Sequence, residues 1–221
     1  MKRSLISLLL ATAGLVSVAS AADIIPVSYT FDQPTACGTY CYHDEGGGQL
    51  TDGIYGVEGW AADLGNGNAQ EWVGWNNQPS VHIDFHFGSA VSISEIRIGT
   101  TQDHVADVVL PSVAVYSSND GFDWTLVSQL AVPESSTNDR PLFGLGPHAT
   151  LTLSALGIAN TSYVRVALNQ SLDGPWTLSD EIDFTGTAAV VPEPETYAML
   201  LGGLGILGVA VRRRRRSVLC A

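Results

Sequence analysis

The chain has 221 residues, of which 45% are hydrophobic and 14% charged, with 22 acidic residues against 10 basic ones. Seven of the basic residues lie in the two terminal segments, so residues 22–191 combine twenty acidic residues with three arginines, a net charge near −17. Such a surface lacks the clustered Lys and Arg that phosphate-backbone binding needs, which excludes nucleic acid as a partner. It also disfavours strongly anionic polysaccharides unless divalent cations bridge them.

The first segment has the three parts of a secretory signal. Lys2 and Arg3 form a positive start, an apolar run covers Leu5–Val18, and Ala19-Ser20-Ala21 forms a small-residue cleavage site. We therefore expect residues 1–21 to be a signal peptide that is removed before Ala22, and the protein to be exported. A buried first helix of the domain is the alternative interpretation.

Two of the three cysteines, Cys37 and Cys41, lie close together in "ACGTYCYHDEGGG". In an exported chain this even pair favours a disulfide that closes a small loop. His43 follows directly, so a metal site that uses both thiols is an alternative, although no second Cys or His pair supports it. The third cysteine, Cys220, belongs to the C-terminal segment.

Residues 22–188 show the pattern of strands and turns, with Gly, Asn, Asp and Pro between the strands. "VHIDFHF" alternates strictly, and "VSISEIRI" follows after Gly88 with a slip of the period at Ser94-Glu95 that predicts a bulge. Further strands are predicted at "SVAVYSS", "WTLVSQL", "SYVRVAL" and "EIDFTG", with a turn at Asn119–Gly121. The long stretch from Ser135 to Ser162 is interpreted as an elaborated loop. The pattern predicts one all-β domain, an antiparallel sandwich.

The order of several motifs is similar to that of discoidin-like domains, also called coagulation factor 5/8 C-type or galactose-binding-like domains. The motifs run from Leu50 to Gly186 and read "LTDG", "VHIDFHFG", "ISEIRI", "VAVYSSNDGFDWTLV", "YVRVAL" and "DEIDFTG". The resemblance implies a jelly-roll β-sandwich that binds sugars, lipids or proteins without catalysis. The chain departs from the family in two respects: no cysteine near Gly186 can bridge the first and last strands, and the segment Ser135–Ser162 is long.

The same resemblance implies a structural calcium ion near the ends of the domain. Its ligands would include Asp52 of the "TDG" turn and Glu181 of the closing strand, with Asp63 from the following loop. Oxygen ligands from separate loops suit this hard cation. The alternative is that Asp52 only shapes its turn and that Glu181 faces solvent.

A sugar site needs an exposed aromatic platform with polar neighbours, and three loop aromatics are the candidates. Trp176 in "LDGPWTLSD" is the first choice, followed by Trp60 and Tyr55. The alternative is that they cap the core at its rim. Trp124 in "DGFDWT" is expected to pack in the core, and Trp72 to pack under the sandwich.

His82, Asp84 and His86 lie on one face of a predicted strand. Two imidazoles and a carboxylate can bind zinc, but residues two apart on a strand are roughly 6.6 Å apart, so a solvated outer face is the preferred interpretation. The sequence has no G-x-S-x-G, no H-E-x-x-H and no phosphate-binding glycine loop before a helix. We therefore expect a protein that is not an enzyme.

Residues 189–221 differ in composition from the domain before them. Thr196–Val211 is apolar or small throughout, and its sixteen residues cover roughly 24 Å as a helix, slightly less than a membrane core. This predicts a short transmembrane helix. The cluster that follows would stay on the cytoplasmic side; it consists of Arg212, Arg213, Arg214, Arg215 and Arg216.

The tripeptide Pro192, Glu193 and Pro194, the apolar span and the arginines together resemble the PEP-CTERM sorting signal of Gram-negative bacteria. The resemblance implies that a membrane-embedded exosortase acts at the tripeptide after transient insertion into the inner membrane. Prolines on both sides of the glutamate favour the extended backbone that a protease requires. The product would reach the cell surface or the extracellular matrix.

These observations lead to a hypothesis about function. The protein would be a surface or matrix protein whose sandwich binds exopolysaccharide or another surface glycan without catalysis. One alternative is a structural biofilm matrix protein that self-associates. A less favoured alternative is a secreted glycan hydrolase.

Overall fold

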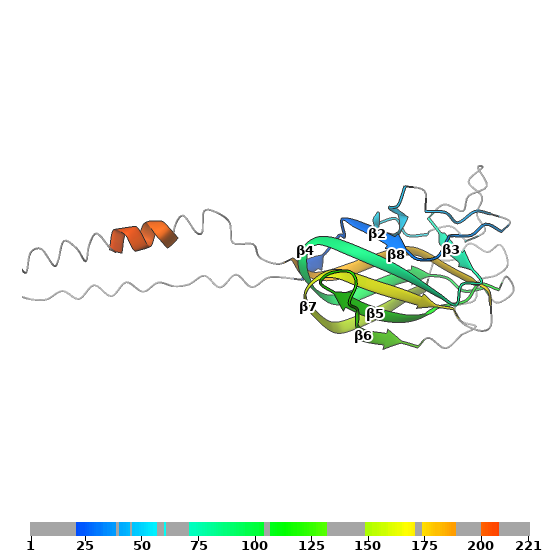
Figure 1. Cartoon of the computed structure of the whole chain (residues 1–221). Coiled ribbons are helices and arrows are strands. Elements are labelled where there is room, and N and C mark those ends of the chain that lie inside the picture. Colours follow the sequence, from blue (N-terminus) through cyan, green and yellow to red (C-terminus); the bar gives the residue numbers. More distant parts are fainter. Residues whose placement is uncertain are drawn as a thin grey trace, which may run out of the picture. The chain divides into compact units, whose positions relative to one another are not determined.

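A computed structural model of the chain describes residues 21–38, 40–44, 46–56, 60, 71–103, 107–131, 149–170, 174–188 and 200–207 (Figure 1). The chain divides into two compact units, Met1–Thr187 and Ala188–Ala221. The signal segment predicted at residues 1–21 lies outside the described residues except for Ala21, as do the Pro-Glu-Pro motif and the arginine cluster.

The first unit is built almost entirely of strands. Its elements are β1 (Ala22–Asp23), β2 (Ser28–Phe31), the 3-10 helix η1 (Gln49–Thr51), β3 (Val73–Asn76), β4 (Ser80–Thr100), β5 (Ser112–Ser118), β6 (Thr125–Leu130), β7 (Ala149–Asn169) and β8 (Trp176–Ala188). The hydrogen-bonded order is β1-β8-β4-β7-β5-β6, with β2 on β4 and β3 on β8. The pairings of β1 and β3 with β8, of β2 and β7 with β4, and of β6 and β7 with β5 are antiparallel.

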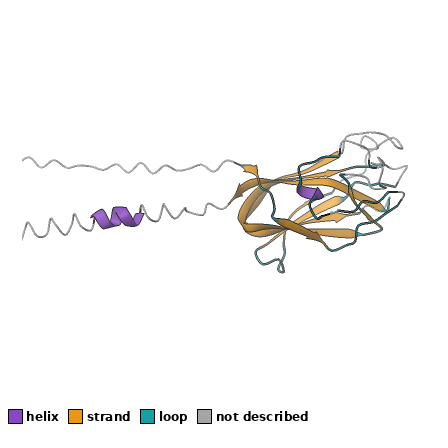
Figure 2. Cartoon of the chain, turned by 90° about the horizontal axis from the view of Figure 1, so that it is seen from above, coloured by secondary structure: helices purple, strands orange, loops and turns teal. Residues whose placement is uncertain are grey.

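The two longest strands, β4 and β7, pass from one layer of the sandwich to the other. The first part of β4 pairs with β2 and the second part of β7, whereas its second part pairs with the first part of β7. Between these parts the register shifts three times, from His86 to Glu95, and Gly88 has a φ of 67°. The bend folds the sheet back on itself, as Figure 2 shows from above. The predicted sandwich and the predicted bulge near Ser94 are both confirmed.

The main core fills the space between the two layers. Phe85 of β4 meets Phe184 of β8 edge to face, with ring centroids 4.8 Å apart, and both side chains are buried. Along β4 the inward residues alternate with polar ones, which is the pattern that the sequence shows. Each such buried apolar side chain contributes about 1.5–3 kcal/mol relative to an exposed one.

One prediction about the strands was wrong. The stretch from Ser135 to Ser162 was interpreted as a loop, but its second half forms the start of β7, with Leu151 and Leu153 buried against β4. Residues 132–148 lie outside the described part. The left-handed backbone at Ala155 and Asn160 interrupts the strand's alternation. This irregularity conceals in the sequence a strand whose residues 149–154 pair with the second part of β4.

The second unit contains a helical stretch at residues 200–207. Within the described part of the chain, no helix combines the length and the apolar character that crossing a membrane requires.

Candidate functional site

The turn between β5 and β6 is a rigid structure that the sequence "SSNDGFDW" dictates. Asp120 Oδ1 accepts hydrogen bonds from the backbone N–H groups of Phe122 and Asp123, both at 2.9 Å, and Ser118 Oγ accepts from Gly121 N at 3.0 Å. These backbone donors lower the pKa of the Asp120 carboxyl. Gly121 supplies the left-handed conformation, with a φ of 78°. The turn predicted at Asn119–Gly121 is confirmed.

This turn holds an aromatic ring in solvent. Phe122 is 85% exposed, although large apolar side chains are normally covered. The prediction that Trp124 packs in the core was wrong, because its ring lies half-buried on the outer face, with the Arg165 guanidinium carbon 4.2 Å from the ring centroid. The cation holds the indole in place by attraction to the ring face. The sequence alone does not decide whether such a tryptophan faces the core or the outer face, because its large amphipathic ring can pack on either side of a sheet.

Next to this turn, the outer faces of β4 and β7 carry two cross-strand pairs. Asp84 lies opposite Arg165 and His86 opposite Tyr163. Arg165 donates two hydrogen bonds to the Asp84 carboxylate, at 2.6 and 2.8 Å, and the bond to Asp84 is the main reason why the pKa of Arg165 is raised. The His86 and Tyr163 rings stack at 4.6 Å between centroids.

Together these elements enclose a surface depression of about 370 Å³, which we call the side-face groove. Three strands and one turn contribute to it, so the sheet register and the turn chemistry both define its shape. It is lined by Ser28, Tyr29, Thr30, Asp84, His86, Asp120, Gly121, Phe122, Trp124 and Tyr163. Exposed ring faces next to carboxylates, hydroxyls and an imidazole form a surface suited to a small polar ligand with an apolar face.

Among the described residues, the donor atoms of His82, Asp84 and His86 on β4 do not converge on one point, and each side chain is partly exposed on the outer face. His82 Nδ1 lies 2.9 Å from Asp32 Oδ2, Asp84 bonds Arg165, and His86 stacks on Tyr163. The three side chains are therefore each held by a partner on β7 or at the end of β2.

The aromatic residues predicted from sequence as ligand contacts lie in two other places. Trp176 and Trp60 are partly buried against a small apolar cluster of Tyr42, Trp72, Val108 and Leu178. Trp176 meets Tyr42 edge to face at 5.4 Å, and a Cβ on Gly38 would lie 3.0 Å from its ring. Trp72 is 1% exposed, which confirms its packing role.

Tyr55 is separate from this pair. The Tyr55 hydroxyl donates to Asp183 of β8. Asp183 lies seven residues after Trp176 on this strand, which is roughly 20 Å in an extended chain. Burial, followed by the hydrogen bond to Asp183, raises the pKa of Tyr55 to about 12. The described residues thus bring Trp176 and Trp60 together but leave Tyr55 apart.

The carboxylates predicted as calcium ligands occupy a third region. Glu181 is buried, with 2% exposure, and its Oε2 accepts a hydrogen bond from Gly53 N at 3.0 Å. The alternative that Glu181 faces solvent was wrong. Burial, together with Asp183, Asp52 and Asp180, raises the pKa of Glu181 to about 8.

The same region contains a cavity of about 190 Å³ to which Asp52, Glu181 and Asp183 contribute. Asp52 Oδ1 also shapes its own turn, by accepting from Ile54 N at 2.8 Å. Asp63 lies outside the described residues. The donor oxygens of these described carboxylates do not all lie within 4.8 Å of one another. Oxygen ligands are of the type that a hard cation takes, and such an ion would need further ligands from backbone carbonyls and water.

Among the described residues, one group of three His, Cys, Asp or Glu side chains has donor atoms within 4.8 Å of one another, namely Cys37, Cys41 and His43. The two cysteines form the predicted disulfide, which is confirmed.

Comparison with known proteins identifies two segments of the chain. Residues 26–141 match the family model "Discoidin domain-containing receptor 1/2, DS-like domain", and residues 190–216 match the PEP-CTERM protein-sorting motif. The sorting motif indicates an exported protein that exosortase processes. No sequence among the curated proteins matches the chain.

Several solved structures are similar to the chain in fold. The C-terminal domain of a chitobiase from Bacteroides fragilis is 17% identical, with 76% of this chain and 99% of that chain covered and a TM-score of 0.47. The family 32 CBM of C. perfringens NanJ in complex with galactose is 14% identical, with coverages of 75% and 99% and a TM-score of 0.48. The CBM32 of AlyQ in complex with 4,5-unsaturated mannuronic acid is 15% identical, with coverages of 74% and 97% and a TM-score of 0.46.

The match over residues 26–141 covers more than half of the 221 residues and coincides with strands β2 to β6 of the sandwich. The chain therefore belongs to the discoidin DS-like domain family and ends in a PEP-CTERM sorting motif.

Proposed function

We propose that this exported, exosortase-processed protein binds a surface glycan in the side-face groove, without catalysis. The observation that carries the proposal is Phe122, a ring that is 85% exposed. It lies on a turn in which three backbone N–H groups donate to side-chain oxygens of Ser118 and Asp120. An exposed aromatic ring costs solvation free energy in the unbound protein, and the turn fixes the backbone that carries this one. It is ready to stack on the apolar C–H face of a sugar ring with little loss of conformational entropy.

The polar groups of the groove supply the remaining contacts. Asp84 and Asp120 accept hydrogen bonds, and the hydroxyls of Ser28 and Thr30 both donate and accept. His86 adds an imidazole that is fixed by its stack on Tyr163. Sugar hydroxyls need such closely spaced donors and acceptors around an apolar platform.

Charge narrows the class of glycan. Arg165, which lies beside Asp84 and Trp124 of the groove, is already engaged by both oxygens of Asp84, so the described lining of the groove presents acceptors and negative charge. Together with the acidic balance of the whole chain, this favours a neutral sugar or an amino sugar over a uronic acid or sulfated sugar. An exopolysaccharide of that composition is the proposed partner at the cell surface or in a biofilm matrix.

We also propose that calcium binds beside Glu181. Asp52 and Glu181 lie on one cavity, and the Gly53 N–H already ties the turn to β8 through the Glu181 carboxylate. Burial raises the pKa of Glu181, and the neighbouring carboxylates raise it further. A divalent cation would neutralise the charge of these carboxylates. Its role would be structural, since it would join the turn after η1 to the closing strand.

The test is a glycan array probed with the purified protein, in calcium and then in EDTA, followed by calorimetry on the best ligand. Phe122→Ala is expected to weaken binding at least tenfold, because it removes the stacking ring without touching the core. Leu126→Ala is the matched control, since Leu126 is also an exposed apolar residue, at 47%, but lies outside the groove. Trp176→Ala tests the alternative location at the rim.

The outcomes separate the hypotheses. Loss of binding in Phe122→Ala alone supports the groove, whereas loss in Trp176→Ala alone moves the ligand to the rim cluster. Failure on every glycan, combined with calcium-dependent self-association in sedimentation, would favour a structural matrix protein. Release of reducing sugar from the polysaccharide would favour a hydrolase.

A further inference from the structure

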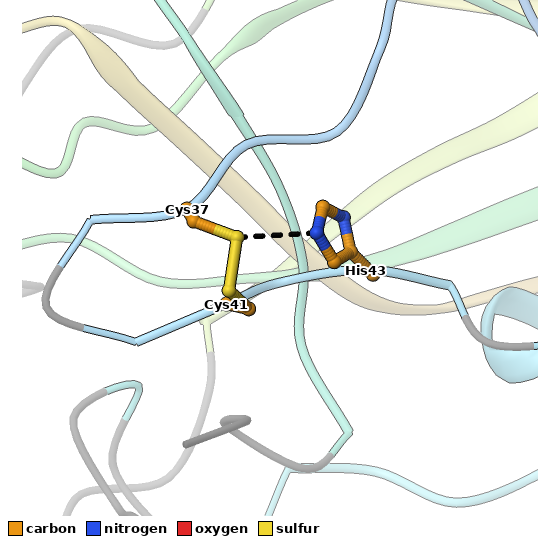
Figure 3. Close-up of side chains that lie close together, drawn as sticks. All are labelled: Cys37, Cys41 and His43. Carbon is orange, nitrogen blue, oxygen red and sulfur yellow. Dashed lines mark hydrogen bonds between the residues drawn. A yellow bond between two sulfur atoms is a disulfide. The ribbon is translucent and has the colours of Figure 1, made fainter.

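The connection between β2 and η1 carries a compact sulfur and nitrogen cluster. Cys37 and Cys41 face each other as an isolated antiparallel bridge and are joined by the disulfide. The His43 ring points at this bridge, with Nε2 3.1 Å from Cys37 Sγ (Figure 3). Cys37 and His43 are exposed and Cys41 is half-buried, so solutes can reach the cluster.

Backbone contacts hold this segment independently of the disulfide. Gly74 of β3 accepts from Ala36 N at 2.9 Å and donates to Tyr42 O at 3.0 Å, so one residue flanking each cysteine is anchored on the same strand residue. Tyr42 is 4% exposed and packs in the small apolar cluster. A bridge that closes so short a loop adds only about 2 kcal/mol by restricting the unfolded chain. The thiols would therefore stay close together after reduction.

His43 is oriented by a second contact. Its Nδ1 lies 2.7 Å from Thr35 Oγ1, which leaves Nε2 directed at the sulfur. Histidines that bind metals commonly make such a bond with the ring nitrogen that does not face the ion, because it fixes the ring and its tautomer. This contact is independent of the cysteines and is already in place.

We propose that Cys37, Cys41 and His43 form a redox-gated site for a thiophilic divalent cation of the Zn²⁺ type. In the reduced chain the two sulfurs and Nε2 would be three ligands, with a fourth position open to water. The three side chains have donor atoms within 4.8 Å of one another, and a tetrahedral zinc ion needs ligand separations of roughly 3.5–3.8 Å, given its bond lengths. Small side-chain rotations meet this requirement.

The redox step is a two-electron reduction of the disulfide by a thiol or phosphine. Two external thiols supply two electrons and two protons, become a disulfide themselves, and leave Cys37 and Cys41 as free thiols. The cation then displaces both thiol protons. Because the bridge uses both sulfurs, disulfide and metal exclude each other, and the same loop reports on redox state and on metal supply.

The experiment uses the full chain with Cys220→Ala, which removes the third thiol of the sequence. The protein is reduced with a phosphine without oxygen and titrated with Co²⁺, a coloured probe for zinc sites. We expect one equivalent to bind with a near-ultraviolet thiolate-to-cobalt band, to be displaced by Zn²⁺, and the oxidised protein to show no band. Circular dichroism before and after reduction checks that the fold persists.

Variants distinguish a metal site that includes His43 from binding of Co²⁺ by the two thiols alone. His43→Ala and Thr35→Val are each expected to weaken Co²⁺ binding by about 10–100-fold, whereas His82→Ala, a histidine held by Asp32 on the outer face, leaves it unchanged. The absence of a thiolate band in the folded reduced protein overturns the proposal, as does unfolding on reduction. Equal affinity in the wild-type protein and in both site variants overturns it as well.

Discussion

Asp84 on β4 and Glu181 on β8 are two strand carboxylates in opposite environments. Asp84 lies on the outer face, partly exposed, and both of its oxygens accept from Arg165 across the strand pair. Glu181 is buried among other acids and accepts one backbone hydrogen bond. The first carboxylate fixes the position of Arg165 on the outer face, whereas ionisation of the second, whose pKa burial raises, destabilises the folded protein. The difference shows that partners, rather than residue type, decide what a carboxylate does.

The largest effect on stability is expected at Gly99 of β4, which lies against Asp180 of β8. A Cβ at Gly99 would lie 1.7 Å from Asp180 Oδ1, so Gly99→Ala must separate β4 from β8. We expect a loss of at least about 3 kcal/mol in the free energy of unfolding, or no folded protein. Chemical denaturation measures it, with Gly48→Ala as the control because nothing lies within 4 Å of a Cβ there. A Gly99→Ala protein of wild-type stability would show that this region is loosely packed.

The second effect concerns the pH dependence that Glu181 imposes. The pKa of Glu181 is raised from 4.5 to about 8 in the folded protein. Between these two pH values the carboxyl is therefore protonated in the folded state and ionised in the unfolded state. In EDTA, the contribution of Glu181 to stability is therefore fully present at and below pH 4.5 and is lost as pH rises to about 8. The loss is about 5 kcal/mol, at about 1.4 kcal/mol for each unit of the pKa shift.

Glu181→Gln should remove this slope, because the amide oxygen still accepts from Gly53 and no longer ionises. Thermal unfolding at several pH values in EDTA measures it. Calcium should raise the stability of the wild-type protein at pH 8 far more than that of the variant. An equal slope in both proteins would assign the pH dependence to other groups.

The third effect tests the ion pair of the outer face. Asp84→Asn leaves the Arg165 charge half-buried beside Trp124 without its carboxylate, and should cost about 1–2 kcal/mol of stability. It should also weaken glycan binding, since Trp124 loses its fixed support. Asp123→Asn on the neighbouring exposed turn is the control for charge removal. A neutral effect of Asp84→Asn on both readouts would mean that the pair does not order the groove.

The smallest effect on stability is expected where the effect on binding is greatest. Phe122→Ala should change the free energy of unfolding by less than about 0.5 kcal/mol, because the ring is 85% exposed. Urea denaturation measures it alongside the binding assay. A loss above 1 kcal/mol would identify Phe122 as a packing residue and would separate it from the ligand surface.

Local patterns in the sequence predicted much of this molecule. Strict alternation predicted the strand around Phe85, and Asn-Asp-Gly predicted the turn between β5 and β6. The close cysteine pair predicted the disulfide. The order of the motifs predicted the discoidin-like family, and the composition of the C-terminal segment predicted the sorting motif. Each of these depends on residues that lie within a few positions of one another or in a fixed order.

Other features depended on contacts between distant segments. The start of β7 is a strand because β4 pairs with it, and Trp124 faces outward because Arg165, from another strand, covers its ring. Glu181 is buried because a turn 128 residues earlier closes over it. The sequence by itself determined most of the strands, the turn at Asn119–Gly121 and the PEP-CTERM motif, since backbone propensity, side-chain period and motif order can be read along the chain. Only the tertiary structure decided which aromatic and acidic side chains share a site, because register and layer packing join residues that no spacing in the chain connects.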